Sequence, residues 1–398
     1  MTPRGAAPLL LALLGCSPAA TPPPAPVAAA AVPEAPAPSA TIPAPAPAAA
    51  APAPAAAPVP AAAASEAPSP ATSANADETA SSDGLARGTG EPADKELSLG
   101  DAAYDAERYK EARAHFRKAE QLAAKDPAPK VGLVRVSVAE ADLPLDYASA
   151  PHDARIPALL KQLDQALKLG ADYAPALLER GHLLLIQGKA EQAKSALEQA
   201  ARLLPRQPEA QSAVGVALVA IGQTKEALPY FERAASLDRN DPDRLGNLGA
   251  VYLLLGRTPD AVQAFEKAAA RAPNNARYQS DLGTAYLAAN RLDRALPALE
   301  RAVVLDPQRA SYLANLSYAL QQSANYERAV TTAERATQLD PKLGSAWLNL
   351  GIARAKRGEL DQAEAAFKRA QALDPEDPRV KANLEELAEL RQKKSGAP

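Results

Sequence analysis

Residues with special chemistry are scarce in this chain, and each scarcity excludes a class of structure or site. The 398 residues include one cysteine, Cys16, and three histidines. A single cysteine cannot form an intramolecular disulfide, so a disulfide-stabilised fold is excluded. Without a second thiol, and with His115, His152 and His182 far apart in the sequence, no zinc-ligand spacing is present. We therefore predict no bound metal and no cofactor.

Charge and glycine placement exclude further classes of function. The net charge is -3 and no basic face stands out, so we do not expect nucleic acid as a partner. The glycines recur at regular intervals instead of clustering in a phosphate-binding loop. No motif frames a nucleophilic serine, histidine or aspartate. We therefore predict that the protein is not an enzyme and takes no small-molecule substrate.

The first sixteen residues have the pattern of a targeting segment. Arg4 is followed by an apolar run over residues 6–14, which is shorter than the roughly 18–20 residues that span a bilayer. The run ends at Leu13-Leu14-Gly15-Cys16, which resembles the lipobox of bacterial lipoproteins. This resemblance implies a signal peptide over residues 1–15, a lipid anchor on Cys16 and attachment to a membrane.

The residue after the cysteine bears on the location of the protein. Position 17 is serine, whereas an aspartate there would, by analogy with enterobacterial sorting, retain a lipoprotein at the inner membrane. The resemblance therefore implies an outer-membrane lipoprotein that faces the periplasm. The alternative is an ordinary secretory signal with an incidental cysteine, which would give a secreted or periplasmic soluble protein.

Residues 16–93 form a long linker in our interpretation. From Ser17 to about Asn75 the chain is almost entirely alanine and proline. Prolines at nearly every second or third position prevent helix formation and remove donors from any sheet. We expect this stretch to be disordered with a polyproline II bias; at about 3.1 Å per residue it reaches at most roughly 180 Å.

A unit of 34 residues is repeated six times after the linker. A small residue recurs at that interval, at Gly181, Gly215, Gly249, Gly283, Ser317 and Gly351. Twelve residues after each comes an alanine, at Ala193, Ala227, Ala261, Ala295, Ala329 and Ala363. Self-similarity at a fixed period indicates a repeat architecture instead of one globular core.

Within a unit the residues resemble the tetratricopeptide repeat. One unit reads Leu248-Gly249, Tyr252, Gly256, Ala261, Phe265, Ala268 and Pro273. Small residues suit the crossing of two helices, Gly256 suits the turn between them, and proline ends the second helix. The resemblance implies pairs of antiparallel helices. The predicted fold is therefore all-α, a right-handed superhelical solenoid that follows a disordered Ala/Pro-rich linker.

The repeats are predicted to cover residues 94–375 as about eight units. The second unit is degenerate, with an inserted loop of about ten residues within 143–156. Residues 376–398 are predicted to form a capping helix and tail, because the last unit of a solenoid needs a polar outer face.

One position of the first helix in each unit is the candidate binding site. It carries asparagine in most units, and the row consists of Asn247, Asp281, Asn315, Asn349 and, in the cap, Asn383. Asparagine offers both a donor and an acceptor, so such a row can pair with the backbone of an extended peptide. It is similar to the asparagine ladder of some tetratricopeptide grooves. The alternative is that these side chains only satisfy local backbone groups.

Two functions from different classes follow from this pattern. The first is an envelope lipoprotein whose groove binds peptide segments of partner proteins, as an adaptor or scaffold, for example for cell-wall enzymes. The second is an assembly factor or pilotin for an outer-membrane machine such as a pilus or secretion complex. The long linker favours the first hypothesis, because a pilotin at the membrane surface needs no reach.

Overall fold

The computed structural model describes residues 84–143 and 148–395. Over these residues the regular structure is helical, without a strand, which confirms the predicted all-α solenoid fold. The predicted signal peptide, the anchor at Cys16 and most of the predicted linker lie outside the described residues. No helix in the described part is long and apolar enough to cross a membrane.

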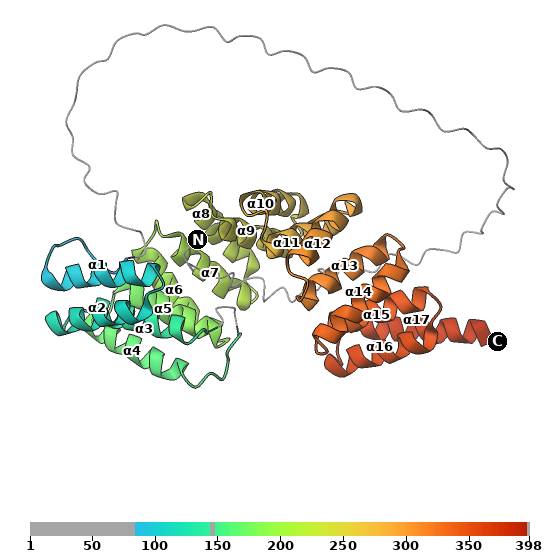
Figure 1. Ribbon diagram of the computed structural model, residues 1–398, viewed down its shortest axis with the longest axis horizontal. Helices are drawn as coiled ribbons and strands as arrows, with labels where there is room; N and C mark the ends of the chain where they lie inside the picture. The colour runs from blue at the N-terminus through green and yellow to red at the C-terminus, as the bar shows by residue number, and fades with distance from the viewer. Residues whose placement is uncertain (1–83, 144–147, 396–398) are drawn as a thin grey trace, which may run out of the picture. The chain divides into compact units, whose positions relative to one another are not determined.

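Seventeen α-helices are present in the part of the chain that the structure describes (Figure 1). In chain order they are α1 (Pro92–Asp105), α2 (Tyr109–Leu122), α3 (Ala128–Glu140), α4 (Ile156–Leu169), α5 (Ala174–Ile186), α6 (Ala190–Leu203), α7 (Pro208–Ala220), α8 (Thr224–Leu237), α9 (Pro242–Leu254), α10 (Thr258–Arg271), α11 (Ala276–Ala288), α12 (Leu292–Leu305), α13 (Ala310–Gln322), α14 (Tyr326–Leu339), α15 (Gly344–Lys356), α16 (Leu360–Leu373) and α17 (Pro378–Ser395).

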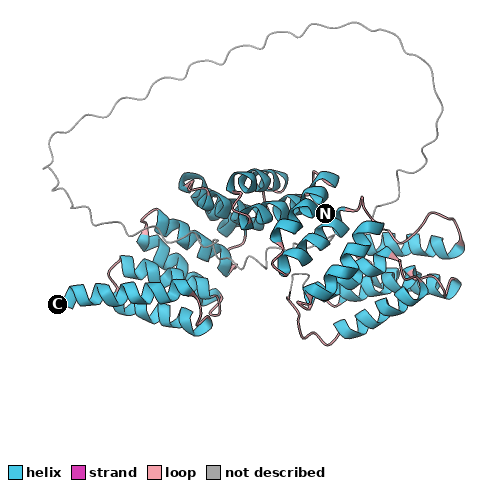
Figure 2. Cartoon of the chain, turned by 180° about the vertical axis from the view of Figure 1, so that it is seen from behind, coloured by secondary structure: helices cyan, strands magenta, loops and turns pink. Residues whose placement is uncertain are grey.

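The helices form hairpins that stack in chain order (Figure 2). An odd-numbered helix from α1 to α15 and the even-numbered helix after it make one unit, and we call them the first and second helix of that unit. Each helix packs on its successor, and each first helix also contacts the first helix of the next unit. The solenoid is therefore continuous along the described residues, and α17 packs on both helices of the last unit.

The turn inside each unit depends on one residue with a positive φ. The left-handed region is free of strain for glycine, and Gly256 has φ +71°, as the sequence predicts for this turn. The same position holds a residue with a side chain in four other units: Glu107, Asp142, Asn290 and Ala324 all have φ between 46° and 59°. The turn geometry therefore persists where glycine has been replaced.

The first-helix glycine that recurs at the repeat period leaves room for one side chain of the second helix. A Cβ added to Gly215 would lie 2.5 Å from Cε2 of Phe231, and one added to Gly249 would lie 2.9 Å from Phe265. Both phenylalanines are fully buried. The sequence suggests close approach of two backbones, whereas the atoms nearest to these glycines belong to the phenylalanine rings.

In the unit of α13 and α14, a different pair of residues fills the space between the two helices. Ser317 stands at the glycine position, and Ala333 stands where other units have phenylalanine or leucine. The serine hydroxyl donates to the carbonyl of Ala329 across the hairpin at 2.9 Å. A smaller side chain on α14 thus makes space for a larger one on α13, whose polar atom is satisfied.

The degenerate second unit departs from this pattern at its first helix. Arg135 occupies the position equivalent to Gly181, and its Nε donates to Oε1 of Glu179 on α5 at 2.6 Å. The inserted loop after α3 is described from residue 148. There the amides of Ala148 and Ala150 donate to the carbonyls of Leu185 and Ile186, at 2.9 and 3.2 Å, so this part of the loop covers the end of α5.

We expect Gly215→Ala to destabilise the solenoid by about 1–3 kcal/mol, because the new methyl group meets a buried ring that has no space to move. Gly246→Ala on α9 is the matched control, since its added Cβ would make only ordinary contact, 3.4 Å from Tyr278. Alanine there should stabilise the helix by up to about 1 kcal/mol. Urea unfolding followed by far-UV circular dichroism compares the two, and equal effects would contradict this packing account.

Candidate functional site

The predicted row lies on the first helices, at the same position of successive units. Asn247 is on α9, Asp281 on α11, Asn315 on α13 and Asn349 on α15, and Asn383 continues the row on α17. We call these five residues the polar row. Asn247 is 4% exposed, Asp281 and Asn349 are each 9% exposed, and the other two are half-buried. Peptide binding by this row stays a prediction.

Three members of the row use their amide groups within the protein. The Nδ2 of Asn315 donates to Oγ of Ser280 at 3.2 Å, and that of Asn349 donates to the carbonyl of Ala314 at 2.9 Å. Each of these bonds joins a first helix to the first helix before it. Asn383 instead donates to the carbonyl of Arg379 on its own helix at 2.7 Å. At these three positions the side-chain amides therefore also stabilise the fold.

The other two members have buried acceptor atoms without a donor in the described part of the chain. These are Oδ1 of Asn247 and Oδ2 of Asp281. One guanidinium nitrogen of Arg277, Nη1, is likewise buried without a partner there. Arg277 lies one helical turn before Asp281 on α11, and α11 packs on α9. Within the polar row, only these two positions carry a buried unpaired atom among the described residues, so we take this part of the row as the candidate for contact with a ligand.

Burial changes the protonation of the row at one position. It raises the pKa of Asp281 to about 7, and the positive charge of Arg277 opposes the shift without cancelling it. Near neutral pH this carboxyl therefore exists in both forms. The protonated form donates a hydrogen bond and the ionised form only accepts, so Asp281 is able to pair with either half of a peptide group.

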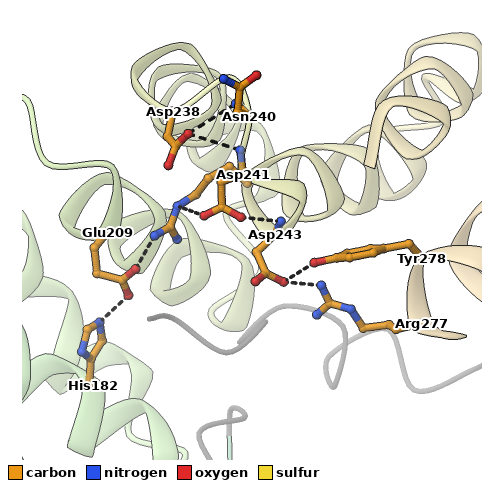
Figure 3. Close-up of polar contacts among 9 residues, drawn as sticks. His182, Glu209, Asp238, Asn240, Asp241, Asp243, Arg277 and Tyr278 are labelled. Carbon is orange, nitrogen blue, oxygen red and sulfur yellow. Dashed lines mark hydrogen bonds and ion pairs between the residues drawn. The ribbon is translucent and has the colours of Figure 1, made fainter. Parts of the chain in front are cut away.

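A charged network joins the first helices from α3 to α11. Arg135 contacts Glu179 as described above, and the imidazole of His182 lies between the carboxylates of Glu179 and Glu209. Figure 3 shows the contact of His182 with Glu209. Its Nδ1 is 3.8 Å from Oε2 of Glu179, and its Nε2 is 3.2 Å from Oε1 of Glu209 on α7. Glu209 in turn accepts from Nη2 of Arg244 on α9 at 2.6 Å.

The pKa values of the network follow from its alternating charges. Burial raises the pKa of both Glu179 and Glu209, but their cationic neighbours outweigh it and lower each to about 2. For Glu179 the main neighbour is Arg135, and for Glu209 it is Arg244. Burial lowers the pKa of His182, but the two neighbouring carboxylates outweigh it and raise the pKa to about 9. The imidazole is therefore a cation at neutral pH.

A second part of the network holds the start of α9 against α11 (Figure 3). Asp241 caps α9 by accepting from the amide of Asp243 at 2.7 Å, and its other oxygen lies 3.4 Å from Nε of Arg244. Asp243 accepts from the hydroxyl of Tyr278 at 2.7 Å and forms a short ion pair with Arg277. The guanidinium of Arg277 lies over the ring of Tyr278, 4.5 Å from its centroid.

The geometry of the charged network indicates a structural role. Its carboxylates are matched with cations. No group of three or more histidine, cysteine, aspartate or glutamate side chains in that part of the chain is arranged to hold a metal ion. The sequence analysis considered His182 only as a zinc ligand, and the structure places it against Glu209 of α7. It did not identify Glu179, Glu209 or Arg244 as its partners.

A cleft of about 490 Å³ lies away from the polar row, beside the turn that joins α11 to α12. Residues of α10 such as Gln263 and Glu266 line one side, and Asn290 and Arg294 line another. The cleft is open to solvent, and none of its lining residues has a buried unpaired polar atom. We therefore assign the candidate site to the first helices.

Comparison with protein families identifies the repeat. Two family models described as tetratricopeptide repeat match the sequence, one over residues 218–282 and 256–320, and the other over residues 85–127, 178–244 and 314–378. Together they cover residues 85–127 and 178–378, which is more than half of the chain. No curated protein gives a significant match to the sequence.

Several solved structures are similar in fold. The crystal structure of the APC/C hetero-tetramer Cut9–Hcn1 aligns with a TM-score of 0.56 and 14% identity, over 76% of this chain and 57% of that chain. The structure of pilF from Pseudomonas aeruginosa aligns with a TM-score of 0.46 and 20% identity, over 54% and 97%. The thermophilic protein TTC0263 from Thermus thermophilus aligns with a TM-score of 0.41 and 23% identity, over 46% of this chain and 98% of that chain. These likenesses concern the fold alone.

The charged network predicts a dependence of stability on pH. The pKa of His182 is raised above its unfolded value, so its contribution is complete below about pH 6.5 and disappears as the pH rises through about 9. We expect the unfolding free energy to fall over this range by up to about 3 kcal/mol more in the wild type than in a His182→Gln variant. Urea denaturation at several pH values measures the difference.

His152→Gln is the control for this experiment, because His152 is exposed in the inserted loop. It should keep the wild-type pH dependence. The lowered pKa values of Glu179 and Glu209 act at the other end of the scale: their contribution is complete above about pH 4.5 and is lost as the pH falls through about 2. An identical pH profile for the wild type and His182→Gln would contradict the charged state of the imidazole.

Proposed function

Because this chain belongs to the tetratricopeptide-repeat family, we propose that it is a non-catalytic scaffold whose first helices bind peptide segments of partner proteins. The proposed contacts are the five residues of the polar row: Asn247, Asp281, Asn315, Asn349 and Asn383. In this proposal the bound segment crosses successive first helices, so several units contribute to one site. The row pairs with the backbone of the segment, and the half-exposed side chains beside it contact the partner's side chains.

The observation that carries this proposal is the group of unpaired atoms on α9 and α11. Asn247 and Asp281 each present a buried acceptor, and Arg277 presents a buried donor. A peptide group has one N–H and one C=O, so an extended segment is able to satisfy an acceptor and a donor at the same place. Leaving such atoms unpaired costs about 1–3 kcal/mol each, and binding removes that cost.

The neighbours of the row suit a segment that is partly apolar. Thr284, Tyr318 and Ile352 are half-buried and lie three residues after Asp281, Asn315 and Asn349 on their helices. A spacing of three places each on nearly the same helical face as the row. Together they offer contact to side chains, while the row offers contact to the backbone.

We further propose that this scaffold works in the cell envelope of a bacterium. The support is the lipobox-like sequence that ends at Cys16 and the Ala/Pro-rich stretch after it. Two or more acyl chains would anchor the protein stably, whereas one chain gives only marginal binding. In this proposal the protein is held at the outer membrane, faces the periplasm, and reaches its partners through the linker. An assembly factor for a pilus or secretion complex is the alternative, and the identity of the captured partner separates the two.

Photo-crosslinking in the intact envelope tests the binding face. We expect probes placed at Tyr318 and Ile352 to give one discrete protein adduct, because both positions are half-exposed beside the row. Asn247→Ala should lower the adduct yield about fivefold at subsaturating partner, the effect of losing one hydrogen bond. Since Oδ1 of Asn247 has no partner within the described residues, removing it breaks no bond through that atom.

A probe at Thr331, which is exposed on the second helix α14, is the control. It should give no adduct. Capture from Thr331 with none from Tyr318 or Ile352 would mean that partners use the second helices, and the polar row would then have only a structural role.

The lipid anchor predicts that Cys16→Ser moves the protein from the membrane fraction to the soluble fraction. Without the thiol no thioether to diacylglycerol can form. Fractionation followed by immunoblotting measures this, with Ser17→Ala as a control that should stay with the membrane. If Cys16→Ser remained at the membrane in the wild-type amount, the anchor assignment would be wrong.

A further inference from the structure

Residues 84–91, directly before α1, lie against the first helices and do not continue the linker predicted to extend to residue 93. We call them the N-terminal segment. Four of its backbone amides donate to two carboxylates of α1; the bonds are Leu85 N and Ala86 N to Asp101 Oδ2 at 2.6 and 3.1 Å, Arg87 N to Asp94 Oδ1 at 2.6 Å, and Thr89 N to Asp94 Oδ2 at 2.7 Å. The two aspartates are seven residues apart, so they share one face of the helix.

Two side chains of the segment reach further along the stack. Leu85 is 2% exposed and belongs to the apolar cluster that contains Leu97 of α1 and Val131 of α3. The guanidinium of Arg87 donates two hydrogen bonds to Asp126, just before α3, at 2.8 and 2.7 Å. It also lies over the ring of Tyr173, just before α5, 5.7 Å from the centroid. The segment thus contacts three successive units.

The contacts of the segment are of a kind that another chain can reproduce. Two carboxylates recognise main-chain N–H groups, which every residue except proline carries. Specificity for the sequence of the peptide comes only from two side-chain contacts. One is the apolar pocket that holds Leu85, and the other is the pair of Asp126 and Tyr173 that contacts Arg87. A bidentate pair between arginine and a carboxylate adds geometric selection to the charge.

Beyond Leu85 the segment is held by polar contacts at the surface. Residues 87–91 are exposed, and a Cβ added to Gly88 or Gly90 would meet no atom within 4 Å. Both glycines have a positive φ, +70° and +74°, and they connect the segment to α1. Release of the segment therefore exposes one buried leucine and leaves the carboxylates of Asp94, Asp101 and Asp126 without these partners.

We propose that the surface formed by α1, the start of α3 and Tyr173 is a binding site for a peptide segment with an apolar residue two positions before an arginine. Residues 84–91 of the same chain, the N-terminal segment, are its resident occupant. A partner segment of this pattern binds by exchange with it. The proposal does not rest on the polar row, because none of its residues belongs to α9–α17.

The covalent connection to α1 determines how strongly the N-terminal segment competes with a free peptide. A segment joined to its site by a short linker has an effective concentration in the millimolar range. A free peptide with the same contacts therefore does not displace it at micromolar concentration. The site opens to such a peptide only when the resident segment loses its own anchors or is pulled away.

The test uses the full chain and a fluorescent peptide with the sequence of residues 82–91. In a Leu85→Ser, Arg87→Ser variant both anchors of the resident segment are removed, while the carboxylates on the helices remain. We expect this variant to bind the peptide at least about tenfold more tightly than the wild type does, by fluorescence anisotropy. A control peptide with serine in place of its leucine and arginine should not bind.

A second change in that variant identifies the surface. Adding Asp101→Asn and Asp126→Asn should reverse the gain in peptide affinity, because these carboxylates receive the amides and the arginine. Adding Asp361→Asn, at an exposed position of α16 far along the chain, should not. If the Leu85→Ser, Arg87→Ser variant is folded by circular dichroism and does not bind the peptide, the N-terminal segment is a fixed part of the fold and the proposal is wrong.

Hydrogen exchange on the wild type gives a result that does not depend on how the variants fold. Millimolar peptide should speed exchange at the amides of Leu85, Ala86, Arg87 and Thr89, and leave α9–α16 unchanged. Unchanged exchange at these four amides would overturn the proposal even if every variant unfolds. Both measurements are separate from the crosslinking at Tyr318 and Ile352, so either proposal can fail alone.

Discussion

The contact between a first-helix glycine and a side chain of the second helix holds most of the units together. Phe231 over Gly215 and Phe265 over Gly249 fill the space between two helices that no other group occupies. Because the second helix is fixed in this way, the opposite side of the first helix is free to contact the next unit. The positions of the polar row and the charged network on successive first helices depend on this arrangement.

Two kinds of polar contact then join the first helices. From α11 to α15 they are neutral hydrogen bonds, in which Asn315 reaches Ser280 and Asn349 reaches the carbonyl of Ala314. From α3 to α11 they are buried ion pairs, with His182 between Glu179 and Glu209 as their centre. Breaking a buried ion pair by removing one partner leaves an uncompensated charge, which costs several kcal/mol. The two ends of the described solenoid are therefore held by contacts of different strength and different response to pH.

The sequence alone predicts the repeated elements, because period, turn glycine and crossing residue recur every 34 residues. It predicts Gly256 in the turn and the row from Asn247 to Asn383 for the same reason. The partners of His182 have no such signal: Glu209 lies 27 residues later on the next first helix, and Arg135 is in a unit with an irregular sequence. The N-terminal segment was missed for a third reason. Its glycines give no helical pattern in the sequence, while its order comes from the carboxylates of Asp94 and Asp101.

The charged network also has a consequence for how this array of units changes during evolution. Repeat proteins gain and lose units by duplication and deletion, which works when neighbouring units are interchangeable. Between α3 and α11 they are not, since each unit supplies one charge to the next, as Glu209 does for Arg244. A unit copied or removed there would place two like charges together or leave one alone inside the protein. Between α11 and α15 the first helices are joined by neutral hydrogen bonds instead, so a copied unit there would meet no such mismatch of charge between first helices.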